Sequence, residues 1–198
     1  MAKRTVSAPT ASDMAEGGRI DKEGVYHLLV KSVVDGEKVD GKAGEGFTIE
    51  LQALASDQAD KTFKTFLADG SPVHKDQGAF ALKKQCAFLV AANAIAPAQL
   101  NGGELEFDPE DAAGHQVIGK LAFGKANADG KRYLDLAGLD IYHVDDPRAP
   151  KCERSMEALA IVPAECRKTA EYFEPLTAKH SHPPASTGSK LNFDDSDL

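Results

Sequence analysis

Alternating apolar and polar side chains predict three strands in the first third of the chain. Residues 25–34 are rich in β-branched side chains and are followed by the turn residues Asp35 and Gly36, a combination that indicates a strand. Residues 47–53 alternate regularly, which is the period of a strand with one buried face. After a turn at residues 55–60, residues 61–67 predict a third strand.

A change of period marks one long helix. Apolar positions recur at helical spacing between residues 77 and 95, so we expect an amphipathic helix there, ended by Pro97. Alternation resumes over residues 115–123, which predicts a fourth strand. An Asp-Gly pair at positions 129 and 130 then indicates a hairpin leading into a fifth strand that runs to His143 and is bent at Gly138.

The predicted order is therefore β-β-β-α-β-β, in a mainly β fold with α-helix. A five-stranded OB-type Greek-key barrel has this order, with its helix at one end of the barrel. A helix packed on an open antiparallel sheet would give the same order. Around this domain we expect termini too poor in large apolar residues to fold. The predicted organisation is a disordered arm at 1–19, an OB-fold-like domain at 20–145, a helical extension at 146–176 with short helices at 153–162 and 164–173, and a disordered linker with an acidic tip at 177–198.

Composition places the chain among ordinary soluble proteins. It has 198 residues, of which 42% are hydrophobic and 27% charged, and a formal net charge of −8. No apolar run approaches the roughly 18 residues that a membrane span needs, and the first residues lack the apolar core of a secretory signal. The three cysteines are widely spaced, without a Cys-x-x-Cys pair, so we expect reduced thiols and a cytoplasmic location.

The candidate enzyme and metal-binding motifs in the sequence lack residues or spacing that such sites require. Residues 36–43 have the spacing of a phosphate-binding loop, but Ala43 replaces the required Ser or Thr and the following glycines oppose a helix. The clustered acids at Asp108, Glu110 and Asp111 are better explained as acids at a helix N-terminus. Four candidate zinc ligands have separations of 14, 14 and 2 positions, unlike zinc sites: Cys152, Cys166, His180 and His182. We therefore expect a protein without enzymatic activity, cofactor or bound metal.

Basic and aromatic residues recur on the predicted strands and hairpin tips. Single-stranded nucleic acid is bound with little sequence preference by aromatic rings that stack on bases and cations that follow the phosphates. Because Phe63 and Phe66 fall on opposite faces of one strand, one of the two must face the core. The candidate nucleic-acid-binding residues are Lys31, Phe63, Lys64, Phe66, Lys120, Lys125, Lys131, Arg132 and Tyr133.

The C-terminal tip combines apolar and acidic residues after a linker rich in Pro, Ser and Thr. Such a peptide suits an apolar pocket with a basic rim on a partner protein, although a solubilising terminus would have the same composition. The candidate partner-binding residues are the anchors Phe193 and Leu198 and the acids Asp194, Asp195 and Asp197.

The strand order, the acidic tip and the segment 61–70 followed by an Ala-rich helix together resemble phage-type single-stranded-DNA-binding proteins of replication and recombination. The resemblance covers residues 20–145 and the last eight residues. It implies a non-catalytic protein in a bacterial or phage-infected cell that coats and protects single strands during DNA replication, recombination or repair. It also implies that the tail recruits replication or recombination enzymes. The chain departs from the family pattern in its final Leu198, where such tails often have an aromatic residue, and in its extra segment at 146–176.

A different class of function is compatible with the same pattern. A structural or assembly protein, for example one associated with a virion, would use the sheet and helices for self-association without nucleic acid. Binding of single-stranded DNA that weakens with salt distinguishes the first hypothesis, whereas a stable homo-oligomer indifferent to nucleic acid distinguishes the second.

Overall fold

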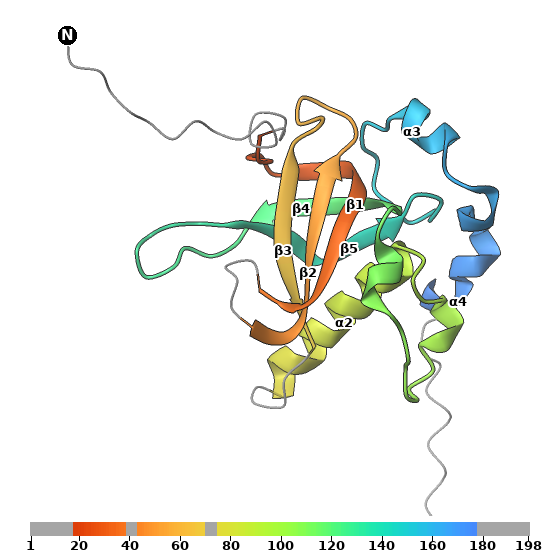
Figure 1. Cartoon of the computed structure of the whole chain (residues 1–198), viewed down its shortest axis with the longest axis horizontal. Helices are drawn as coiled ribbons and strands as arrows, with labels where there is room; N and C mark the ends of the chain where they lie inside the picture. The colour runs from red at the N-terminus through yellow and green to blue at the C-terminus, as the bar shows by residue number, and fades with distance from the viewer. Residues whose placement is uncertain (1–17, 39–42, 70–74, 178–198) are drawn as a thin grey trace, which may run out of the picture.

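The computed structural model describes residues 18–38, 43–69 and 75–177. Its centre is a five-stranded antiparallel open sheet in which the strands lie side by side in the order β3-β2-β1-β4-β5 (Figure 1). The strands are β1 (Gly24–Glu37), β2 (Ala43–Ala53), β3 (Thr62–Ala68), β4 (Gln116–Phe123) and β5 (Leu134–His143). All five predicted strands are therefore present, and β1 is longer than the sequence pattern indicated.

β1 is the central strand and pairs with different neighbours along its length. Its first half, Gly24 to Leu29, pairs with β4, while residues from Leu28 to Glu37 pair with β2. Register shifts interrupt the β1–β2 ladder between Val30 and Ser32 and again further along the strand. Extra residues of this kind bend a strand and increase its twist, so β1 curves as it passes from one partner to the other.

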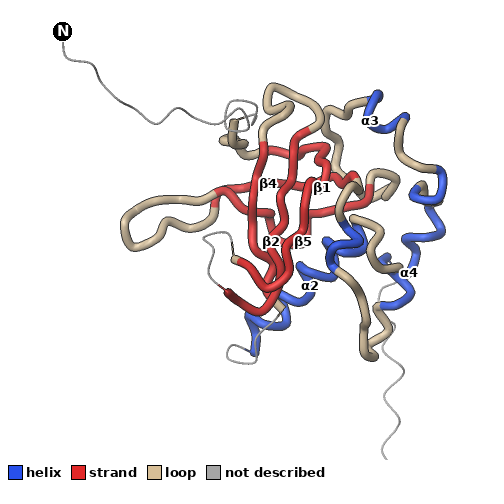
Figure 2. Tube along the Cα trace, in the orientation of Figure 1, coloured by secondary structure: helices blue, strands red, loops and turns tan. Residues whose placement is uncertain are grey.

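The long helix α2 (Lys75–Ala91) packs against β3 and β5, the two edge strands of the sheet. Figure 2 shows the helix lying across one end of the strands. The helix ends earlier than predicted. Asn93 has φ +60°, and the Ala94 N–H donates to the Leu89 carbonyl, the pattern of a left-handed helix cap. The helix is therefore ended by Asn93 rather than by Pro97.

The core lies between the inner face of the sheet and α2. Alternate residues of β2 and β3, including Ile49, Leu51 and Phe63, are at most 1% exposed. Phe88 of α2 enters the same cluster, with its ring centroid 5.9 Å from that of Phe47. Burial of such side chains stabilises the fold by about 1.5–3 kcal/mol each.

The bend predicted in the fifth strand is confirmed. Gly138 has φ +57°, a conformation that glycine adopts without steric cost. Across the β4–β5 ladder, Gly119 pairs with Ile141 and Leu121 pairs with Leu136, so β5 holds extra residues at the bend. As a result β5 changes direction between its two paired segments.

The residues after β5 run along one side of the sheet (Figure 1). They contain α3 (Met156–Ala160), α4 (Glu174–Thr177) and short 3-10 turns at Ala164–Cys166 and Ala170–Phe173, less helix than the sequence predicted. Two further 3-10 turns, Pro97–Gln99 and Pro109–Ala112, lie between α2 and β4. Phe173 is buried and packs 5.6 Å from the ring of His143, which attaches this extension to β5.

At the other end of the described chain, the residues before β1 join the sheet edge. The Thr62 N–H donates to the Gly18 carbonyl, and the Ile20 N–H donates to the Thr62 carbonyl. The rest of the N-terminal arm and the C-terminal linker and tip lie outside the described residues, so their predicted disorder stays a prediction.

Candidate nucleic-acid interface

The outer face of β3 presents two of the three predicted residues on that strand. Lys64 and Phe66 point outward, while Phe63 is only 1% exposed and belongs to the core. The expectation that the two phenylalanines face opposite sides is confirmed. Phe63 is removed from the candidate interface, because a ring enclosed in the core has no free face on which a base can stack.

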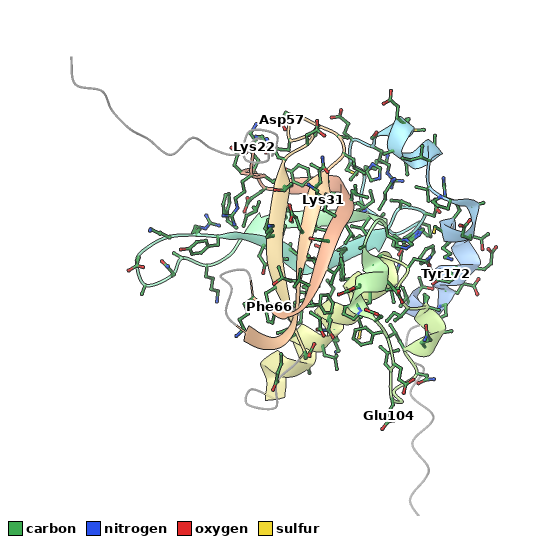
Figure 3. The ribbon with its side chains drawn as sticks, in the orientation of Figure 1. Lys22, Lys31, Asp57, Phe66, Glu104 and Tyr172 are labelled. Atoms are coloured by element: carbon green, nitrogen blue, oxygen red, sulfur yellow. The ribbon has the colours of Figure 1, made fainter. Side chains whose placement is uncertain are left out.

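Phe66 is partly exposed and carries a cation beside its ring. The Lys38 Nζ lies 5.6 Å from the ring centroid of Phe66, within the range of a cation–π contact. Figure 3 places Phe66 on the sheet and away from the C-terminal extension. Lys38, which directly follows the end of β1 at Glu37, was missed by sequence reasoning because the polar, glycine-containing segment around it resembles a mobile loop.

Two of the predicted lysines are engaged in ion pairs with neighbouring strands. Lys64 lies directly opposite Glu50 of β2, with 3.1 Å between Nζ and Oε2. Lys120 of β4 lies 3.7 Å from Asp140 of β5. The side chains of Lys64 and Lys120 are 52% and 50% exposed, and ion pairs at the surface contribute about 1 kcal/mol or less, so a phosphate can compete for either lysine. Lys31 is exposed on β1, at the first register shift.

The β4–β5 hairpin holds the remaining predicted residues and projects well beyond the sheet (Figure 1). Tyr133 is 57% exposed, and Lys125, Lys131 and Arg132 are exposed as well. The Arg132 guanidinium donates to the carbonyls of Gly124 and Phe123 and lies 5.5 Å from the Phe123 ring centroid. This side chain therefore lies along the base of the hairpin.

Hydrogen bonds within the turn give this hairpin a defined shape. The Asn127 side-chain oxygen accepts from the N–H groups of Asp129 and Lys131, at 3.0 and 2.9 Å. Gly130 follows with φ +74°, which is the glycine position that the Asp-Gly pair predicted. The flanking cations are thus held on a loop whose shape these hydrogen bonds define.

The structure therefore gathers the predicted residues into two groups. One lies on the outer face of β1–β3, with Lys31, Lys64 and Phe66. The other is the β4–β5 hairpin, to which the structure adds Phe123. Sequence reasoning missed the Phe123 ring because alternation alone does not show that Arg132 lies over it. Lys120 lies on β4, next to Asp140.

The structure describes some of the remaining sequence candidates, while others lie outside the described residues. The phosphate-binding-loop candidate at residues 36–43 lies between the end of β1 and the start of β2. The element that follows it is therefore a strand and not the helix that such a loop requires. Within the part of the chain that the structure describes, no cluster of His, Cys, Asp or Glu could hold a metal ion. His180, His182 and the partner-binding candidates of the tip lie outside the described residues. Glu110 and Asp111 do occupy the first turn of a 3-10 helix, and Asp108 caps it.

Comparison with known proteins adds no assignment. A scan against protein-family models finds no match, and neither does a search of the curated proteins. Over residues 18–38, 43–69 and 75–177, no helix is both long and apolar enough to cross a membrane.

Proposed function

We propose that the chain is a single-stranded-DNA-binding protein built on an OB-type barrel. Three observations support the barrel. The strand order β3-β2-β1-β4-β5 with a long helix between β3 and β4 is compatible with a five-stranded OB-type barrel. The same helix contacts both edge strands. The Thr65 hydroxyl of β3 donates to Asp135 of β5 at 2.8 Å, so the two edges approach each other.

The arrangement of aromatic rings and cations carries the functional proposal. OB folds bind oligonucleotides on the face of their second and third strands and between the loops that follow the first and fourth strands. Here that face carries the Phe66 ring beside Lys38, and the loop after β4 carries exposed Tyr133 with two lysines. Rings that stack on bases and cations that follow phosphates bind single strands with little base preference.

The net charge of −8 does not oppose this proposal. At moderate salt, interactions between exposed charges that lie more than about 10 Å apart are largely screened. A DNA strand in contact with the hairpin therefore responds mainly to the nearby lysines. In this role the protein coats and protects exposed DNA in the cytoplasm during replication, recombination or repair. The acidic tip, with Phe193 and Leu198 as anchors, recruits partner enzymes.

The direct test is the anisotropy of a labelled poly-dT oligonucleotide of about 30 nucleotides, longer than the ~4–16 nucleotides that one OB fold covers. The full-length protein is titrated at low and moderate salt, with a duplex of equal length as control. We expect binding to the single strand only, weakened by salt. If neither nucleic acid binds at micromolar protein, the proposal is wrong, and a stable homo-oligomer in sedimentation would then favour the assembly role.

Paired variants locate the binding face. Phe66→Ala removes one stacking ring, and loss of about 1–3 kcal/mol per base weakens binding roughly 5- to 150-fold. Phe80→Ala, which removes an exposed ring on α2, leaves affinity unchanged.

A second pair of variants tests the phosphate contacts. Lys125→Ala reduces the magnitude of the negative slope of log K against log salt by about 0.7, the value for one phosphate contact on a single strand. The exposed Lys83 of α2 supplies its control, Lys83→Ala. Equal effects in variant and control would place the DNA elsewhere.

A further inference from the structure

A completely buried histidine connects the sheet to the C-terminal extension. His27 of β1 is 0% exposed. Its Nδ1 accepts a hydrogen bond from the backbone N–H of Ser155, at 3.2 Å, and its Nε2 lies 3.0 Å from Oε1 of Gln116. Gln116 in turn donates through Nε2 to the carbonyl of Ala158 in α3, at 2.8 Å. The two His27 bonds reach residues 128 and 89 positions away in sequence.

These partners require a neutral imidazole. A backbone N–H is only a donor, so Nδ1 must carry a lone pair, and the ring proton must be on Nε2, where it donates to Gln116. Protonation of Nδ1 would place a second N–H against the Ser155 N–H and remove the bond. Ser155 also caps α3 by accepting from the Ala158 N–H, so its displacement would disturb the start of that helix.

The charges around His27 do not favour its protonated form. Arg154 is the charged side chain that acts on the ring, and its positive charge lowers the pKa of His27. Burial is the larger cause of the lowered pKa, and the hydrogen bond with Gln116 opposes it. Arg154 itself is held in place by the Val144 carbonyl at 2.9 Å. The proton is therefore accepted more readily when the ring is released to water.

His143 offers an internal comparison with a different geometry. Its Nε2 lies 3.0 Å from the Cys166 carbonyl of the extension, an interaction that a protonated ring still makes as donor. Its Nδ1 accepts from the N–H of Asp145, only two residues away, and the Asp145 carboxylate lies 3.9 Å from the same nitrogen. Burial lowers the pKa of His143 most, Lys168 and His115 lower it further, and Asp145 raises it. Protonation there breaks no long-range bond.

A cavity of about 280 Å³ lies between the sheet and the extension, beside this network. Its walls include Leu29, Gln116 and His143 from the sheet side and Ile161 and Cys166 from the extension. His115 also lines it, and burial and the nearby Lys168 lower the pKa of that residue while Asp111 raises it. Gln116 belongs both to the cavity wall and to the His27 hydrogen bonds.

We propose that His27 is a proton-sensitive latch, which holds α3 against the sheet while neutral and releases residues 151–163 when its Nδ1 is protonated. The effect of pH on docking follows from the proton that the released ring binds and the docked ring does not. The ring released to water has a pKa of about 6.5, so docking is undisturbed above that pH and weakens as pH falls below it. If the docked ring stays neutral, the equilibrium constant for release rises about 30-fold between pH 7.5 and 5.0. Release uncovers the apolar wall at Leu29.

Hydrogen exchange on the full-length protein tests the latch. Peptides covering residues 151–163 are compared at pH 7.5 and 5.0, after correction for the intrinsic pH dependence of exchange, with α2 peptides as reference. We expect the opening constant of residues 151–163 to rise about 30-fold while α2 keeps its protection. Unchanged protection of residues 151–163 at pH 5.0 would overturn the proposal.

Two asparagine variants separate the latch from a general effect of acid. In His27→Asn, Oδ1 replaces Nδ1 as an acceptor for the Ser155 N–H and does not titrate, so the acid-induced opening should disappear. His143→Asn should retain it. A His27→Asn protein that opens with the same pH dependence would refute the role of His27. Should that variant fail to fold, NMR titration of the unmodified His27 ring decides, since its protonation must coincide with opening.

Discussion

Replacement of Asp135 should separate the two edges of the sheet. Its Oδ1 accepts from the Thr65 hydroxyl of β3 at 2.8 Å and from the Leu136 N–H at 2.7 Å. Its Oδ2 lies 3.0 Å from Nζ of Lys84 in α2. One carboxylate on β5 thus connects the opposite edge strand and the helix that spans both edges. Asp135→Ala leaves all three donors without this acceptor.

The cost can be worked out from burial. Thr65 is 9% exposed, and a hydrogen bond from a buried hydroxyl to a charged group contributes about 1.5–3 kcal/mol. The side chain of Lys84 is 15% exposed and that of Asp135 is 49% exposed, so their ion pair adds about 0.5–1 kcal/mol. We expect Asp135→Ala to lower the free energy of unfolding by about 2–4 kcal/mol.

Urea denaturation followed by far-UV circular dichroism measures this loss, because the chain has no tryptophan to report on unfolding. Asp140→Ala is the matched control: the same type of residue in the same strand, paired with Lys120 at 3.7 Å where both side chains are about half exposed. It should cost less than about 1 kcal/mol. A double-mutant cycle with Thr65→Val isolates the contact between the edges. The reasoning is refuted if Asp135→Ala costs no more than Asp140→Ala, or if the cycle shows no coupling.

Two further predictions concern stability and use the same denaturation assay. Gly46 has φ +125°, and a Cβ there would lie 2.1 Å from the Leu67 carbonyl oxygen, so Gly46→Ala should cost more than about 3 kcal/mol. Gly36 has φ +67° and open space around it, so Gly36→Ala should lower the free energy of unfolding by only about 1 kcal/mol. Similar losses for Gly46→Ala and Gly36→Ala would contradict the packing described. Phe63→Ala should cost about 3–5 kcal/mol because it opens a cavity in the core, whereas the outward Phe66→Ala should cost under about 1.5 kcal/mol; the reverse order would mean that the faces of β3 are misassigned.

Local pattern determined the strands and the helix, because backbone geometry translates side-chain spacing directly into exposure. The period of two in residues 47–53 is visible without knowledge of any partner strand, and the same rule placed Phe63 and Phe66 on opposite faces. Because both are phenylalanines, the two side chains taken alone do not show which one is inside. Only packing against the core settled that Phe63 is the buried residue and therefore unable to stack on a base.

Tertiary structure decided every feature that depends on residues distant in sequence. Asp135 meets Thr65 across 70 positions, and His27 meets Ser155 across 128. No periodicity joins such residues, because their approach follows from strand order and from the curvature of the sheet. The sequence by itself therefore determined the elements and which side chains share a face, through short-range geometry. The fold determined which faces are buried and which distant groups meet, since those contacts exist only once the whole chain has packed.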